Sequence, residues 1–430
     1  MLGLTTALRL AQRGDRVTVL ESAQQLGGLA SPWTLGDLVW DRFYHVTLLS
    51  DQHLRRLLRD LRLEDSMEWR ITRTGCFVGG QTHSVSSSLE FLKFPALSLV
   101  DKLRLAATVF RASKIHDSVN LEKVLVEDWL TRWSGASAFE TFWKPLLRSK
   151  LGDDYRRTSA AFIWATISRL YAARRSGLKR EMFGYVRGGY ARVIERFADS
   201  LQELGVDLRP GFRVEEIRTN GRGVSVSQAD GEPVLADQAV ITVAPPLVPG
   251  ICPQLSSSEA SRLRNLEYLG VVCASMLTPA EFGGFYVTNL LDESLPFTGL
   301  IEMSALVDRQ QFGGRTLLYM PKYLSGDDPL FQSTDQEIRQ LFLGALERMF
   351  PQFKARQADT FQVARNRHVF PVPVLGYSSV APPVTTSVPG VSLLNSAQII
   401  NGTLNVNETV LLAEKGVRQL IERYEQTAPS

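Results

Sequence analysis

The apolar positions of the first twenty residues recur at helical spacing and then at strand spacing. The helical pattern ends at Gly14, and a short apolar run over residues 16–21 finishes in an acid, Glu21. The apolar helical positions are Leu4, Ala7, Leu8 and Ala11. This order predicts a helix followed by a strand whose carboxyl end carries a carboxylate.

Further along, residues 85–180 are mostly of helical pattern, with amphipathic stretches at 99–115 and 160–175. The predicted strands cover 214–217, 224–227, 239–243, 270–277 and 316–320. The last predicted elements are a helix over 335–350, a strand over 391–394 and a helix over 406–424. Strands alternate with helices at both ends, so we expect one discontinuous α/β domain with a second domain inserted in two pieces.

Composition narrows the functional class. A chain of 430 residues suits two domains, and its net charge of +3 gives nucleic-acid binding no support. Cys76, Cys252 and Cys273 lie far apart, which argues against a disulfide scaffold and against a zinc site. Neither a signal-peptide pattern nor a run of eighteen apolar residues occurs, and we expect a cytoplasmic protein.

The spacing of Gly3, Gly14 and Glu21 resembles the second half of the dinucleotide-binding fingerprint GxGxxG. In that pattern Gly3, followed by Leu4, is the third glycine, where the helix packs closely on the sheet. Glu21 is then placed to accept hydrogen bonds from ribose hydroxyls. The first strand and the first two glycines of the fingerprint are absent, so we expect the natural reading frame to extend upstream of Met1.

A second glycine pair, Gly27-Gly28, precedes Leu29 and resembles the loop that follows the ribose-binding acid in flavoproteins similar to amine oxidases. In that family the loop passes near the pyrophosphate and flavin, where glycine permits close backbone approach. Asp41 and His45 follow, and related families often carry an Asp and a His here. His45 is therefore a candidate near the flavin, and a structural histidine in a loop is an equal alternative.

Two later passages continue the resemblance to the protoporphyrinogen oxidase and flavin amine oxidase family. Residues 184–217 resemble the stretch that re-enters the FAD domain, which implies that backbone groups of Val214 hold the adenine. Residues 388–397 resemble the family motif PGLYLAGDA, with Asn395-Ser396 in place of Gly-Asp. Ser396 retains one hydrogen-bonding group there, and Asn405, Val406 and Asn407 begin a helix whose N-terminus would face the flavin.

The resemblance implies a glutathione-reductase-like, Rossmann-type FAD-binding domain formed by residues 1–80, 184–260 and 360–430. An α+β substrate domain would comprise 81–183, a helical insert, and 261–359, a β-sheet. The implied function is FAD-dependent oxidation of a small organic molecule by hydride transfer. Two alternatives remain: a non-redox flavoenzyme similar to UDP-galactopyranose mutase, and a flavin-free remnant that acts as a binding protein.

The reacting residues are less well indicated. Many amine oxidases carry a lysine near the flavin on a strand that corresponds to residues 268–274, and no lysine occurs there. This favours dehydrogenation of the protoporphyrinogen oxidase type over amine oxidation, with Lys322 as a weak alternative lysine. Residues 144–192 are rich in Lys and Arg. A solvated helix face, a mouth for an anionic substrate and a peripheral membrane contact are the three interpretations of that segment.

Overall fold

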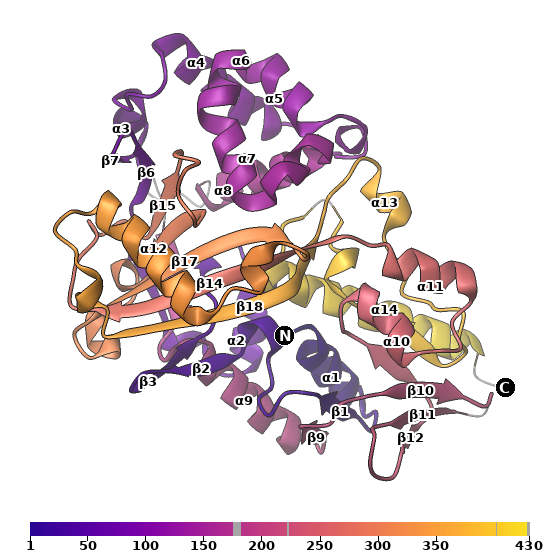
Figure 1. Ribbon diagram of the computed structural model, residues 1–430. Coiled ribbons are helices and arrows are strands. Elements are labelled where there is room, and N and C mark those ends of the chain that lie inside the picture. Colours follow the sequence, from indigo (N-terminus) through magenta and orange to yellow (C-terminus); the bar gives the residue numbers. More distant parts are fainter. Residues whose placement is uncertain (175–181, 222, 401, 428–430) are drawn as a thin grey trace.

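The computed structural model describes residues 1–174, 182–221, 223–400 and 402–427. Figure 1 shows an α/β part, a large mixed sheet and a helical part, which confirms the predicted fold class. In the α/β part, helix α1 (Leu2–Arg13) leads into β1 (Thr18–Glu21), and Gly14 ends the helix with a φ of 101°. That left-handed conformation is the usual helix stop and favours glycine.

The parallel strands of this part form two pairs. Strand β1 pairs with β9 (Asp207–Pro210), and β13 (Ala239–Ile241) pairs with β19 (Val391–Leu393). No strand of the described residues hydrogen-bonds β1 to β19. Helix α14 (Val406–Thr427) packs against both α1 and α2 (Gln52–Asp60), so helices hold the two pairs in one unit.

A seven-stranded mixed sheet forms the centre of the second part. Its spatial order is β18 (Thr360–Pro371), β14 (Tyr268–Thr278), β17 (Thr316–Ser325), β16 (Gly299–Glu302), β15 (Val287–Leu290), β6 (Thr74–Val78) and β7 (Gln81–Ser84). Strand β14 is buried along its whole length. Gly270 lies where its register with β18 shifts, and a Cβ there would lie 2.6 Å from the Asn366 carbonyl oxygen. The bulge therefore requires a residue without a side chain.

Six helices between residues 88 and 174 stand above this sheet in Figure 1. They are α3 (Ser88–Leu92), α4 (Leu99–Ala112), α5 (Val126–Ser134), α6 (Ala136–Ala138), α7 (Lys144–Leu151) and α8 (Ala160–Arg174). Their apolar faces form a core around Trp129, Phe139 and Trp143 that also includes Leu269 and Phe370 of the sheet. None of the described helices is both long and apolar enough to cross a bilayer.

The remaining elements connect these parts. Strand β8 (Met182–Val186) pairs with both β4 (Thr47–Leu48) and β5 (Met67–Ile71), and it leads into α9 (Gly189–Glu203). The other elements are the strands β2 (Pro32–Leu35), β3 (Leu38–Asp41), β10 (Glu216–Thr219), β11 (Val224–Ser227) and β12 (Val234–Ala236), and the helices α10 (Val248–Ile251), α11 (Ser257–Arg264), α12 (Asp335–Met349) and α13 (Tyr377–Val380).

Two of the expected domain boundaries need correction. Strand β6 and strand β18 were assigned to the FAD-binding domain by the limits at 80 and 360, but both hydrogen-bond within the seven-stranded sheet. The substrate part therefore begins before residue 80 and continues past residue 360. Strand pairing between distant segments decides these limits, and local periodicity carries no information about it.

We predict that Gly416→Ala lowers the free energy of unfolding by about 1–2 kcal/mol. A Cβ at this interior position of α14 would lie 2.8 Å from Cδ1 of the fully buried Leu394 and closer still to Cδ2. The matched control is Gly344→Ala in α12, where the nearest atom would be 4.0 Å away. It should raise stability by about 0.5–1 kcal/mol through helix propensity. Denaturant unfolding measures both, and stabilisation by both substitutions would contradict the packing argument.

Candidate functional site

A cavity of about 1490 Å³ lies between the α/β part and the substrate part. Pockets for single small ligands usually have about 300–1000 Å³, so this one has room for a dinucleotide and a second molecule. One side is formed by the starts of α1 and α14, the end of β1 and the loops after β13 and β19. The other side is formed by residues of α3, α4, α7, α8, β14, β17 and β18.

The N-terminus of α1 forms one end of the cavity. Gly3 and Leu4 line it, together with Glu21 from the end of β1. No side chain caps the first turn of α1, so its N–H groups are free to bind an anion such as a diphosphate. A Cβ at Gly3 would lie 3.2 Å from Thr242 Oγ1, just after β13. The close approach of helix to sheet that the fingerprint implies is therefore present.

The loop of Gly27, Gly28 and Leu29 also lines the cavity. Gly27 and Gly28 have φ values of 116° and 62°, which L-residues with side chains rarely adopt. A Cβ on Gly27 would lie 3.0 Å from Ile194 Cδ1, whereas one on Gly28 would meet nothing within 4 Å. The first glycine thus permits packing on α9, and the second leaves its backbone accessible.

The loop after β19 presents an unused donor. Asn395 and Ser396 both line the cavity, and Asn395 is 1% exposed. Its Oδ1 accepts a hydrogen bond of 2.9 Å from the Ala397 N–H, while its Nδ2 is buried with no partner among the described residues. A buried amide donor without a partner is costly unless a ligand accepts from it. Sequence reasoning noted Asn395 only as a departure from the family motif.

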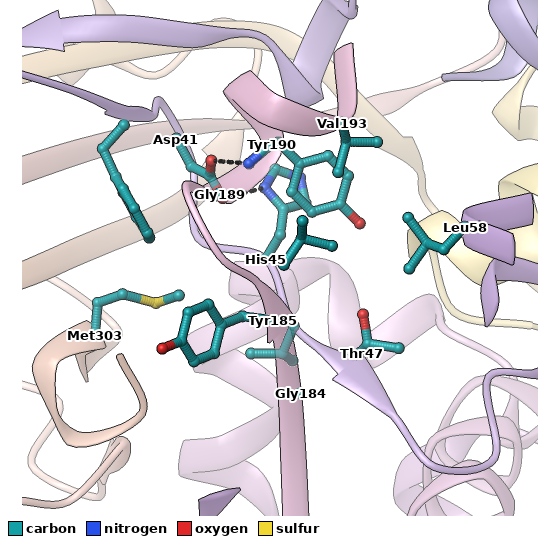
Figure 2. Close-up of a pocket in the computed structure, with 13 residues that line it drawn as sticks. Asp41, His45, Thr47, Leu58, Gly184, Tyr185, Gly189, Tyr190, Val193 and Met303 are labelled. Atoms are coloured by element: carbon teal, nitrogen blue, oxygen red, sulfur yellow. Dashed lines mark hydrogen bonds and ion pairs between the residues drawn. The ribbon is translucent and has the colours of Figure 1, made fainter. Parts of the chain in front are cut away.

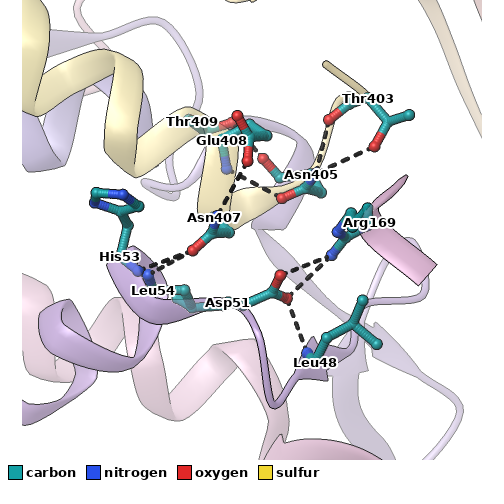
Figure 3. Close-up of polar contacts among 10 residues, drawn as sticks. All are labelled: Leu48, Asp51, His53, Leu54, Arg169, Thr403, Asn405, Asn407, Glu408 and Thr409. Atoms are coloured by element: carbon teal, nitrogen blue, oxygen red, sulfur yellow. Dashed lines mark hydrogen bonds and ion pairs between the residues drawn. The ribbon is translucent and has the colours of Figure 1, made fainter. Parts of the chain in front are cut away.

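Asn405 and Asn407, at the start of α14, cap different helices, and their hydrogen bonds are drawn in Figure 3. Asn405 and Val406 line the cavity, and Asn405 Oδ1 caps α14 by accepting from the Glu408 N–H at 3.0 Å. Asn407 does not line the cavity. Its Oδ1 accepts from the His53 and Leu54 N–H groups at 2.9 and 3.2 Å, so it caps α2 from another part of the chain.

Two other predicted residues lie outside the cavity lining. Val214 is partly buried and packs against the core cluster that includes Ile217 and Val226 of β10 and β11. Lys322 is on β17, and because side chains alternate along a strand, its neighbour Tyr323 lines the cavity while Lys322 does not. Burial lowers the pKa of Lys322, with Asp328 acting in the opposite direction. The expectation of a flavin-proximal lysine at this position is not supported by its placement.

His45 lies in the cavity wall and also borders the smaller pocket drawn in Figure 2. Its ring lies against Tyr190, with 4.6 Å between centroids, and its Nδ1 is 3.8 Å from Asp41 Oδ2. Asp41 Oδ1 accepts from the Tyr190 N–H at 2.7 Å and so caps α9. A Cβ at Gly189 would lie 2.7 Å from the same Oδ1, which explains the glycine there.

The substrate side contains a charged group that sequence reasoning did not single out. Lys150 of α7 lines the cavity, and its Nζ lies 3.6 Å from the Tyr323 ring centroid and 5.3 Å from that of Phe370. Tyr323 and Tyr44 share a hydrogen bond of 2.9 Å between their hydroxyl groups. Burial lowers the pKa of Lys150, partly opposed by Tyr44. No acidic side chain of the described residues forms an ion pair with this lysine.

The other basic residues of the 144–192 segment are largely neutralised. Their ion pairs are Lys144–Glu140, Arg148–Glu293, Arg157–Glu267, Arg169–Asp51, Arg187–Glu68 and Arg192–Glu195. Arg175, Lys179 and Arg180 lie outside the described residues. The described part of this segment is therefore largely ion-paired. Lys150 and Arg169 both line the cavity, and of these two Lys150 is the one without an ion-pair partner among the described residues.

Comparisons with known proteins agree with this geometry. The model of the family described as flavin containing amine oxidoreductase matches residues 2–393. A search of curated protein sequences found no match.

Solved structures share the fold at low sequence identity. One, assigned as a protoporphyrinogen oxidase from Exiguobacterium sp. 255-15, is 16% identical with a TM-score of 0.76, covering 98% of this chain and 96% of that one. Cyclohexylamine oxidase from Brevibacterium oxydans IH-35A is 18% identical with a TM-score of 0.69, covering 99% and 97%. Reduced UDP-galactopyranose mutase is 13% identical with a TM-score of 0.72, covering 98% and 92%.

We predict that Asn407→Ala lowers the free energy of unfolding by about 0.5–2 kcal/mol, because α2 loses its only side-chain cap seen among the described residues. Asn407→Asp keeps the oxygen that caps α2 but loses the Nδ2 donor to Glu408 Oε1, so it should recover part of the loss seen in Asn407→Ala. Denaturant unfolding compares the two. Equal losses for both variants would show that the side chain acts by something other than capping.

Proposed function

The chain belongs to the family of flavin-containing amine oxidoreductases, and from this premise we propose that it oxidises an apolar substrate that carries a carboxylate. It is an FAD-dependent oxidoreductase. The observation that supports the finer proposal is Lys150, a partly buried lysine on the substrate side of the cavity that has no ion-pair partner among the described residues. The substrate is a small molecule, and its anionic character is the proposed part.

The residues around the cavity fit FAD. The first turn of α1 would bind the diphosphate, and Glu21 would accept from ribose hydroxyls. The Gly27–Gly28 loop and the free Asn395 Nδ2 would contact the cofactor between its two ends. The N-terminus of α14 would favour negative charge at the pyrimidine end of the ring. When bound, FAD supplies a two-electron acceptor for a hydride from the substrate.

The charges that line the cavity favour an anion over a cation. Glu21 is the one carboxylate among the described lining residues, and it lies at the end assigned to the ribose. On the substrate side Lys150 is surrounded by aromatic and aliphatic side chains. An ammonium group that is partly removed from water is stabilised by an opposite charge, so a substrate carboxylate would pair with it, whereas a cationic amine would be repelled.

The cysteine thiols have no role in the proposed oxidation. Cys76, Cys252 and Cys273 are all buried and free. Burial raises the pKa of Cys76 to about 12 and that of Cys252 to about 11, so neither forms a reactive thiolate near neutral pH.

The mutase-like alternative gains no support from the charges in the cavity. Such an enzyme would need arginines to bind a substrate diphosphate, and Arg169 is the one arginine among the described lining residues. Its guanidinium is already paired with Asp51 at 3.0 Å.

We also propose that the protein is located in the cytoplasm and contacts a membrane at its periphery. The ion-paired residues of the 144–192 segment are not the basis for such a contact.

We predict that FAD is bound noncovalently and that Glu21→Ala weakens its affinity by about 1–3 kcal/mol, since the ribose hydroxyls lose an acceptor. Denaturation should release free FAD, and flavin fluorescence titration of the apoprotein should measure the change. Glu232→Ala, at an exposed loop residue, is the control. Unchanged affinity in the Glu21 variant would remove that residue from the cofactor site.

We predict that anaerobic mixing with protoporphyrinogen bleaches the flavin without NAD(P)H, whereas putrescine and cyclohexylamine do not. Lys150→Met should weaken binding of a carboxylate porphyrin roughly tenfold or more, because a buried charge-assisted hydrogen bond contributes about 1.5–3 kcal/mol. Lys144→Met, at a lysine paired with Glu140 outside the cavity lining, is the control. Reduction by the amines instead, or equal affinity of the parent protein for the carboxylate porphyrin and for its neutral methyl ester, would refute the anionic-substrate proposal.

A further inference from the structure

Helix α4 buries polar side chains and exposes apolar ones, which is the reverse of an ordinary surface helix. Its buried face carries Asp101, Lys102 and Thr108 as well as Leu105 and Ala112. Asp101 accepts from Ser98 and Ser137, Lys102 Nζ donates to the Leu92 carbonyl at 2.7 Å, and Thr108 bonds Ser134. These hydrogen bonds satisfy the buried polar groups and hold that face of α4 inward. The apolar residues on the opposite face therefore point outward.

The outer face of α4 is an apolar stripe. Leu99, Leu103, Ala106 and Phe110 follow each other at helical spacing, and the three large ones are 63%, 61% and 57% exposed. Val100 extends the stripe on α4, and Leu89 and Leu92 extend it on α3, with exposures of 58%, 74% and 48%. Helices α3 and α4 are in contact at one end of the molecule in Figure 1. Contiguous apolar surface of this kind usually marks an interaction site.

Cations border the stripe. Lys93, Arg104, Arg111 and Lys114 are exposed on the same segment, and Lys114 Nζ lies 5.3 Å from the Phe110 ring centroid. The acids of α3 and α4 are Glu90, which is engaged in the capping box of α3, and the buried Asp101. A helix with an exposed apolar face and flanking Lys and Arg matches a surface that lies in the interface of an anionic bilayer.

The stripe also borders the cavity. Four of its exposed residues also belong to the cavity lining: Leu92, Leu103, Ala106 and Phe110. The cavity therefore reaches the surface at the apolar stripe. A molecule that leaves the bilayer through this opening would travel over apolar side chains to the interior without crossing water.

We propose that the α3–α4 stripe docks on an anionic lipid bilayer, so that the cavity opens into the membrane and takes up its apolar substrate from there. The stripe supplies the apolar contact, and Lys93, Arg104, Arg111 and Lys114 supply the attraction to lipid phosphates. Docking requires neither flavin nor turnover, so a test of docking is independent of a test of the proposed oxidation.

Vesicle co-flotation of the full chain tests the proposal. The protein should float with vesicles containing phosphatidylglycerol, less with pure phosphatidylcholine, and less as salt rises. The double variant Leu103→Glu with Phe110→Glu should reduce the floated fraction about tenfold or more, because two charges would enter the interface. Leu235→Glu, at an apolar residue of β12 that is 73% exposed, is the matched control and should float like the parent.

A second variant tests the contribution of the cations to docking. Lys93→Glu with Lys114→Glu leaves the apolar stripe intact and should abolish the preference for phosphatidylglycerol and its salt dependence. Circular dichroism of each variant checks folding. Equal flotation of the parent and the Leu103/Phe110 variant would overturn the proposal. So would the absence of flotation together with conversion of a dimer to a monomer by that variant, which would assign the stripe to a contact between protein chains.

Discussion

The carboxyl group of Asp41 is the junction on which the site depends. It is 2% exposed, and its Oδ1 accepts from the Tyr190 N–H at the start of α9. The carbonyl oxygen of the same residue accepts from the Tyr319 hydroxyl of β17 at 2.6 Å. One residue thus joins the end of β3, the helix that re-enters the α/β part and the central sheet. A buried carboxyl is stable only with such partners, so the three segments hold each other in place.

This junction determines the wall of the cavity. Tyr44 and His45 lie three and four residues after Asp41, and they can face the cavity because Asp41 is held on both sides. The caps of neighbouring helices work in the same way, since Asn407 caps α2 and thereby fixes the start of α14 relative to it. Capping groups supplied from distant segments therefore position the cavity lining as well as the helices.

The interior and the surface of the substrate part each contain groups that lack their preferred surroundings. Inside, Lys150 has no acidic partner among the described residues, and outside, α4 exposes apolar residues bordered by cations. Both features would be costly in an isolated soluble domain, because each leaves a group without its preferred surroundings. Each cost is offset if the cavity receives an anionic apolar molecule and its mouth lies against anionic lipid. The two proposals therefore explain observations that core packing alone does not.

By itself, the sequence determined the class of the fold, the helix from Leu2, the acid at Glu21 and the glycine pair at Gly27–Gly28, because these depend on local periodicity and on backbone conformations that only glycine adopts readily. Only the tertiary structure placed β6 and β18 in the substrate sheet, turned Lys322 away from the cavity and brought Lys150 into it. It also made Asn407 a cap for α2, and within the described part of the chain it left Asn395 Nδ2 without a partner. These outcomes depend on which distant segments meet, and neither spacing nor composition encodes the direction in which a side chain will point once they do.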